Sequence, residues 1–84
     1  MINLLYFAWV RERVGIAAEE IAMPSDVATV GDLVAWQRQR GEGYAEAFAD
    51  DDVVRTAVNQ EHVDLGHPVK NGDEVAFFPP VTGG

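Results

Sequence analysis

The segment Glu74-Val75-Ala76-Phe77-Phe78-Pro79-Pro80-Val81-Thr82-Gly83-Gly84 combines a strand, a stop signal and a pair of glycines. Its first five residues are mostly apolar and predict a β-strand whose side chains alternate between the two faces of a sheet. The two prolines end the strand, because proline has no backbone N–H to donate to a neighbouring strand. Glycine lacks a Cβ, so the final pair predicts a thin, flexible tail that fits a narrow channel.

Four further segments have the composition of strands. Residues 2–9 are rich in large and aromatic apolar side chains, which is typical of a central strand. Residues 19–23 alternate weakly and predict a strand antiparallel to the first. Residues 53–59 form a β-type run, and residues 63–65 indicate a short edge strand. Because the first and last strands are the most apolar, we expect them to pair in parallel at the centre of the sheet.

One main helix is predicted to begin after Thr29. This residue is a suitable N-cap, and Asp32 follows three residues later, where an acid favours the helix N-terminus. Arg38 and Arg40 are expected in the last turn, with Gly41 at the C′ position that closes the helix. Shorter segments complete the pattern: a helical turn at residues 11–15, a short helix at residues 44–48 and a loop at residues 50–52.

The order of these elements, β-β-α-β-(β)-β, is an α+β pattern. A crossover through a helix is the usual connection between parallel strands. We therefore predict a β-grasp, or ubiquitin-like, fold: a mixed sheet of four to five strands packed against one main helix, with a flexible C-terminal Gly-Gly tail. The β-grasp domain is expected to span residues 1–78, and the extended tail residues 79–84.

The chain has 84 residues and a net charge of −8, from 14 acids and 6 bases. Nucleic-acid affinity depends on lysines and arginines that neutralise phosphates, so we expect no nucleic-acid partner, and the same deficit disfavours anionic membranes. No apolar run approaches the roughly 18 residues of a membrane-spanning helix, and the first residues lack the basic lead of a signal peptide. We therefore expect a cytoplasmic domain whose acidic surface attracts basic protein surfaces.

The chain lacks a complete set of catalytic residues. It contains no cysteine, which excludes disulfides, zinc–thiolate sites and thiol nucleophiles. We interpret its two histidines, His62 and His67, as surface or turn residues rather than catalytic bases. The acidic run at residues 50–52 has neither EF-hand spacing nor a closing glutamate. We therefore predict that the folded domain holds no cofactor and no metal.

Three blocks of the sequence resemble a known family: residues 7–15 (FAWVRERVG), 57–60 (AVNQ) and 67–84 (HPVKNGDEVAFFPPVTGG). They resemble the MoaD/ThiS family of ubiquitin-like sulfur carriers and, within it, the small subunits of molybdopterin synthase. The resemblance covers nearly the whole chain, and the last block is the most specific. Residues 41–52 match nothing in the family on which an inference about partners can be based.

The resemblance implies a cycle of sulfur transfer at the C-terminal carboxylate of Gly84. An ATP-dependent adenylating enzyme of the ubiquitin-activating kind makes an acyl-adenylate, and a persulfide from a sulfurtransferase displaces AMP. The resulting thiocarboxylate enters the large subunit of molybdopterin synthase and donates sulfur to cyclic pyranopterin monophosphate, which forms the molybdopterin dithiolene. AMP and sulfur are thus transient covalent groups at Gly84. The resemblance also implies that the catalytic residues belong to the large subunit, in a heterotetramer with two carriers at the ends of a large-subunit dimer.

The tail is expected to thread into that active site. When fully extended it spans about 20 Å, which is long enough to reach a buried site. Pro79 and Pro80 stiffen its base and so lower the entropy lost on insertion. Val81 and Thr82 supply side-chain contacts, and Gly83 keeps the thread narrow.

Docking on partners is predicted for four residues outside the tail: Phe7, Arg11, Val58 and Phe77. The three apolar side chains would lie on an uncovered sheet face, where aromatic residues are favoured anchors. An equally open interpretation places them in the core. Arg11 either pairs with an acid of a partner or bridges Glu12 or Asp73 within the chain.

Two other functions remain open from the sequence. The first is a carrier of sulfur for thiazole or another sulfur metabolite, and the ending Phe-Phe-Pro-Pro-Val-Thr-Gly-Gly favours the molybdopterin branch over it. The second is a ubiquitin-like protein modifier that joins Gly84 to lysine amines through isopeptide bonds. A stable large synthase subunit as partner would favour the carrier, whereas isopeptide ladders would favour the modifier.

Overall fold

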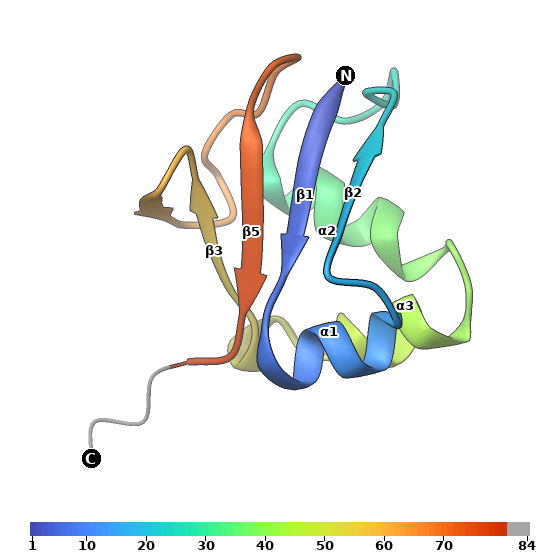
Figure 1. The fold of residues 1–84 in the computed structure, drawn as a ribbon. Helices are drawn as coiled ribbons and strands as arrows, with labels where there is room; N and C mark the ends of the chain where they lie inside the picture. Colours follow the sequence, from blue (N-terminus) through green and yellow to red (C-terminus); the bar gives the residue numbers. More distant parts are fainter. Residues whose placement is uncertain (81–84) are drawn as a thin grey trace.

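The computed structural model describes residues 1–80, and the predictions made for Val81, Thr82, Gly83 and Gly84 lie outside these residues. The described chain forms a five-stranded sheet, with α2 against one face and α1 and α3 at one end (Figure 1). The strands are β1 (Ile2–Tyr6), β2 (Ala18–Ile21), β3 (Arg55–Val58), β4 (Glu61–Val63) and β5 (Glu74–Phe78). The helices are α1 (Ala8–Val14), α2 (Val30–Arg38) and α3 (Glu42–Ala47), and a 3-10 turn, η1, spans Asp51–Val53.

The strand order β2-β1-β5-β3-β4 places β5 in the middle of the sheet, with β1 beside it. β1 and β5 run parallel, with Leu4 opposite Val75 and Tyr6 opposite Phe77. The other neighbouring pairs in the described chain are antiparallel. The predicted β-grasp fold, with a mixed sheet and a parallel pairing of the first and last strands, is therefore confirmed.

β3 and β4 form a tight hairpin. Its two turn residues, Asn59 and Gln60, have φ angles of 52° and 71°. A two-residue turn with positive φ at both positions matches the right-handed twist of the flanking strands, and asparagine tolerates this region better than most residues. The Asn59 side chain also donates to Asp73 and accepts the N–H of Glu74, each at 3.0 Å. The hairpin turn is thereby tied to the beginning of β5.

Thr29 begins α2 as predicted. Its hydroxyl accepts the N–H of Asp32 at 3.1 Å, and the Asp32 carboxylate accepts the N–H of Thr29 at 3.2 Å, which completes a capping box. The end of the helix differs from the prediction, because α2 stops at Arg38 and Gln39 closes it in a right-handed conformation. Gly41 is not its C-cap; with φ at 151°, it begins α3 instead.

The first strand is shorter than its composition predicts. β1 ends at Tyr6, Phe7 remains extended, and α1 begins at Ala8, whose φ is 52°. Left-handed backbone angles cost a non-glycine residue about 1–2 kcal/mol, so this abrupt turn stores local strain. The helical turn predicted at residues 11–15 is the end of this longer helix, which Gly15 closes at φ 97°.

The hydrophobic core lies between α2 and one face of the sheet. Tyr6 stacks on Phe77 with ring centroids 5.9 Å apart, and Phe48 meets Phe77 edge-on at 4.8 Å. All three aromatic side chains are fully buried. Aliphatic residues from the strands, the helices and the connecting segments complete this core: Ile2, Leu4, Val10, Ile21, Val27, Val30, Leu33, Val34, Ala47, Val54, Val58, Val69 and Val75. In Figure 1, α2 lies behind the sheet, and no helix of the described chain crosses the front face.

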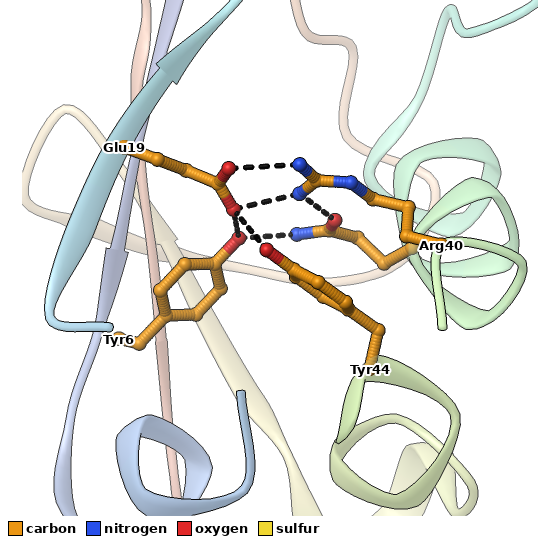
Figure 2. Close-up of polar contacts among 5 residues, drawn as sticks. Tyr6, Glu19, Arg40 and Tyr44 are labelled. Atoms are coloured by element: carbon orange, nitrogen blue, oxygen red, sulfur yellow. Dashed lines mark hydrogen bonds and ion pairs between the residues drawn. The ribbon is translucent and has the colours of Figure 1, made fainter. Parts of the chain in front are cut away.

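A polar network joins the sheet to α2 and α3 (Figure 2). The Glu19 carboxylate accepts hydrogen bonds from Tyr6 Oη at 2.7 Å, from Tyr44 Oη at 2.8 Å, and from two Arg40 nitrogens at 2.6 and 2.8 Å. Gln37 Nε2 donates to Tyr6 Oη at 2.8 Å. The sequence predicted Arg40 in the last turn of α2. In the structure Arg40 follows the end of the helix, and its side chain reaches back to β2.

The network lowers the pKa of the Glu19 carboxyl, whereas the pKa values of both phenols, Tyr6 and Tyr44, are raised, mainly by burial. Hydrogen bonds from Arg40 lower the pKa of Glu19 from its ordinary 4.5 to about 2. Burial, followed by the hydrogen bond to Glu19, raises the pKa of Tyr6. Glu19 is thus ionised and Tyr6 neutral across the physiological range, so that each phenol can donate to the carboxylate.

Replacing Glu19 with glutamine is expected to lower the free energy of unfolding at pH 7 by about 1–3 kcal/mol, because Arg40 loses a charge-assisted, two-point partner. Glu20→Gln is the matched control, since Glu20 is exposed on the opposite side of β2, and it should change stability little. Urea denaturation of the three proteins measures the difference.

The same variants test how the contribution of Glu19 to stability depends on pH. Because the folded pKa of Glu19 lies below its ordinary value, its contribution to stability is complete above about pH 4.5 and is lost as the pH falls toward 2. The stability gap between wild type and Glu19→Gln should therefore narrow over this range. A gap that stays constant from pH 7 to pH 2 would contradict this role for the carboxylate.

Candidate functional site: the open sheet face at the base of the tail

The uncovered face of the sheet has an apolar row across three neighbouring strands. Leu5 of β1 lies opposite Ala76 of β5, and Ala76 lies opposite Ala57 of β3. These side chains share a face because residues of paired strands that lie opposite each other point to the same side of a sheet. Together with two aromatic residues of the adjacent row they form what we call the open-face patch: Leu5, Phe7, Ala57, Ala76 and Phe78.

The second row of the patch contains its two aromatic side chains. Phe7 is extended, and its N–H donates to the carbonyl of Phe77 at 3.0 Å, so it continues the parallel pairing beside β5. Its side chain is 49% exposed and alternates with that of the buried Tyr6. Phe78 likewise alternates with buried Phe77 and is half-buried. The two phenylalanines therefore flank the point at which β5 ends.

β3 and β4 contribute a polar edge to the patch. His62 lies opposite Ala57, and its ring centroid is 5.1 Å from that of Phe78. Arg55 lies opposite Phe78 in the register of β3 and β5 and is exposed. The patch is thus bordered by two nitrogen-bearing side chains on the side of the β3–β4 hairpin.

The tail begins at this end of the patch. β5 ends at Phe78, and Pro79 and Pro80 follow it away from the sheet (Figure 1). At the opposite end of the same face, Asn3 lies between Glu20 and Glu74 in the register of β2, β1 and β5. Charges of opposite sign therefore lie at the two ends of the open face, with acids where β5 begins and Arg55 where it ends.

Two residues expected on the docking surface belong to the core instead. Phe77 is completely buried and Val58 is 5% exposed, both on the face that α2 covers. The predicted alternation along residues 74–78 is correct, and of the two interpretations left open for Val58 and Phe77 the structure supports the core. The sequence did not reveal which face α2 covers, and a shift of one residue exchanges the two faces. Phe78, Ala76, Ala57 and Leu5 were missed for this reason.

The other two predicted docking residues, Phe7 and Arg11, are exposed. Arg11 lies on α1 and makes no ion pair within residues 1–80. Its proposed bridge to Asp73 is wrong, because Asp73 is buried and accepts hydrogen bonds from Asn59 Nδ2 and from the N–H of Lys70. Phe7 thus lies in the open-face patch, and Arg11 lies on the helix that follows it.

The described residues offer few alternatives to this surface. No group of three or more His, Cys, Asp or Glu side chains within residues 1–80 could hold a metal ion. A hollow of about 160 Å³ is lined by residues that include Asn59, His67 and Lys70, and it is smaller than typical ligand sites. A shallower hollow of about 390 Å³ borders the open-face patch at Arg55, His62 and Asp64. None of the helices in the described range has both the length and the apolar character needed to cross a membrane.

A pair of adjacent phenylalanines tests the assignment of faces. Phe77→Ala is expected to cost about 3–5 kcal/mol of stability, because it opens a cavity in the aromatic core. Phe78→Ala removes a half-exposed ring and should cost about 1 kcal/mol or less. Urea denaturation under identical conditions compares the two, and equal losses would contradict the assignment of these faces.

Comparisons with known proteins give a consistent result. Residues 4–84 match the ThiS family. The molybdopterin synthase sulfur carrier subunit of Escherichia coli (strain K12) is 48% identical over 84 residues, covering 100% of both chains. The structure of a putative molybdopterin converting factor, subunit 1, from Pyrococcus furiosus is similar with a TM-score of 0.74 and 31% identity, over 95% of this chain and 97% of that chain.

A further solved structure is a protein–protein complex of subunits 1 and 2 of the molybdopterin-converting factor from Helicobacter pylori. One of its chains is similar to this chain with a TM-score of 0.66 and 27% identity, over 99% of this chain and 97% of that chain. The sequence match and the shared fold extend over nearly the whole molecule. The chain therefore belongs to the ThiS family, and it is similar along its full length to molybdopterin synthase sulfur carrier subunits.

Proposed function

We propose that this chain is the sulfur carrier subunit of a molybdopterin synthase and acts in molybdenum cofactor biosynthesis in the cytoplasm. The observation that carries the proposal is the full-length match to a sulfur carrier subunit at 48% identity. The arrangement of the domain supports it, since β5 leads directly from the core to the base of a Gly-Gly tail. A carrier needs this separation between a stable domain and a reactive end.

The reactive group in this proposal is the carboxylate of Gly84. A carboxylate is a poor electrophile, and transfer of AMP from ATP gives it a good leaving group. A persulfide sulfur then attacks the acyl carbon and AMP departs; reduction of the acyl disulfide by a thiol leaves the thiocarboxylate. The adenylating enzyme and the sulfurtransferase supply these steps, and AMP and sulfur are bound only transiently at Gly84. The folded domain itself binds no cofactor in this cycle.

The receiving partner is the large synthase subunit, into which the tail inserts from residue 79 onward. The H. pylori complex of subunits 1 and 2 supports a paired arrangement of this kind. The open-face patch lies beside the base of the tail, with Phe7 exposed, Leu5, Ala76 and Phe78 partly exposed, and Ala57 buried between its neighbours. A contiguous apolar surface of this kind is typical of docking sites. We propose that the patch docks on the large subunit while the tail enters its active site, in a heterotetramer with two carriers at the ends of a large-subunit dimer.

Intact-mass spectrometry of the protein purified from cells that make the cofactor tests the carrier role. The expected result is a species in which one terminal oxygen is replaced by sulfur, and the purified species should convert cyclic pyranopterin monophosphate to molybdopterin with the large subunit. Covalent conjugates through lysine, without any thiocarboxylate, would instead favour a protein modifier. A thiocarboxylate that transfers its sulfur only into thiazole would assign the chain to another pathway.

Deletion of Gly84 is expected to abolish sulfur transfer and to leave the melting temperature unchanged. The truncation moves the carboxylate back by one residue, and a displacement of about 1 Å can already cost on the order of a hundredfold in rate. Molybdopterin formation and thermal melting are measured on the same preparation. Synthesis at the wild-type rate by the truncated chain would refute the assignment of Gly84.

Phe78→Asp is expected to weaken the complex with the large subunit at least tenfold, because it removes an aromatic ring from the patch and docking would desolvate the carboxylate that replaces it. Asn3→Asp is a control for the added charge, since Asn3 is exposed at the far end of the same face. Titration calorimetry gives the affinities, and melting curves confirm folding. Equal affinities of Phe78→Asp and the wild type would exclude docking through the patch.

A further inference from the structure

Arg55 stands out at the tail end of the open face. It is the first residue of β3, is exposed, and lies opposite Phe78 in the sheet register. The Phe78 ring also packs against the ring of His62. Both rings lie on the same face of the sheet as the side chain of Arg55. A partner that covers the open-face patch therefore also covers the guanidinium of Arg55.

Most other basic side chains already have a partner within the chain or lie elsewhere. Arg40 pairs with Glu19, Arg13 lies 4.4 Å over the Trp9 ring, and Arg38 donates to the carbonyl of Phe48. Lys70 lies in the loop that precedes β5, at the opposite end of that strand from Phe78. Within residues 1–80, Arg55 makes no ion pair.

The acid in the best position to neutralise Arg55 is engaged elsewhere. The hairpin register pairs Thr56 with Val63, the last residue of β4, so Asp64 follows just beyond the strand on the side of Arg55. However, Asp64 Oδ1 accepts the N–H of Gly66 at 3.0 Å in a turn, and no ion pair joins Asp64 to Arg55. The guanidinium therefore keeps its hydrogen-bonding capacity for a group outside this chain.

Burial of an unpaired guanidinium is costly, because the charge loses its water without compensation. Arginine presents a planar fork of N–H donors that matches a carboxylate at two points. We propose that Arg55 binds a carboxylate of the large synthase subunit and acts as a specificity determinant for the partner of this carrier. The inference rests on the proposed docking through the open-face patch and adds the chemistry that the partner must present: an acidic side chain facing the corner formed by Arg55, Phe78 and His62.

The corner also differs from the rest of the surface in the sign of its charge. The chain as a whole has a net charge of −8, so long-range attraction draws it toward basic surfaces. An exposed cation beside the tail has the opposite requirement over a short range. A partner that meets both the long-range and the short-range requirement has a basic surface with one acidic side chain facing the corner. This combination excludes other partners and fixes the orientation of the bound one.

The test compares two charge reversals of equal size. Arg55→Glu and Lys70→Glu change the net charge by the same amount, but only the first lies at the proposed interface. Titration calorimetry with the large subunit should show at least a ~30-fold loss of affinity for Arg55→Glu and less than a ~3-fold change for Lys70→Glu. Arg55→Gln should fall between them. Melting curves of all variants verify that the carrier is folded.

A charge exchange then identifies the partner group. Each Asp and Glu on the surface of the large subunit is replaced in turn by arginine and titrated with Arg55→Glu. One of these variants should recover at least tenfold of the lost affinity while weakening binding of the wild-type carrier. If no variant does so, or if both charge reversals weaken binding equally, the proposed carboxylate contact is wrong.

The experiments distinguish a failure of the inference on Arg55 from a failure of the proposed function. If wild-type carrier fails to bind the large subunit, the proposed function fails before Arg55 is considered. If the wild type binds and Phe78→Asp disrupts the complex, but Arg55→Glu binds as tightly as the wild type, only the inference on Arg55 is overturned.

Discussion

The parallel pairing of β1 with β5 is the constraint on which the rest of this structure depends. It places the end of the chain in the middle of the sheet, where Val75 and Phe77 complete the core against α2. It also aligns the ends of both strands, so that Phe7 and Phe78 lie in the same row at the base of the tail. A terminal strand at the edge of the sheet would deliver the tail without this apolar surface around its base.

Two adjacent residues of β5 point to opposite faces of the sheet, one into the core that stabilises the fold and the other onto the open face. Phe77 is fully buried against Tyr6 and Phe48, whereas Phe78 lies on the open face beside His62. The sequence was sufficient to predict the strand, its alternation and its parallel partner, because these follow from local composition and period. It was not sufficient to decide which set of side chains faces α2, since that depends on where a distant helix packs. This single ambiguity left Val58 and Phe77 undecided between the open face and the core, and the structure places them in the core.

The local signal for the beginning of α2 was reliable, whereas the signals for its end and for the end of β1 were not, and contacts between distant residues were not predicted. Thr29 and Asp32 form their capping box within one turn, so the pattern of residues predicts it directly. Glu19 and Arg40 are 21 residues apart, and no local pattern indicates that they meet. The same holds for Ala8, whose left-handed φ is imposed by the need to leave the sheet immediately after β1. In both cases the tertiary arrangement selects the conformation.

The position of the Glu19 network explains how the domain tolerates a functional surface that is not covered. Its hydrogen bonds hold β2, α2 and α3 together on the covered side of the sheet, away from the open-face patch. Burial of Phe77 and its neighbours stabilises that same side. Exposed apolar side chains and an unpaired Arg55 can therefore remain on the other side, because the interactions that stabilise the fold do not depend on them. Under the proposed function, this division lets the carrier dock through the open face and be released without a change in the interactions that stabilise its fold.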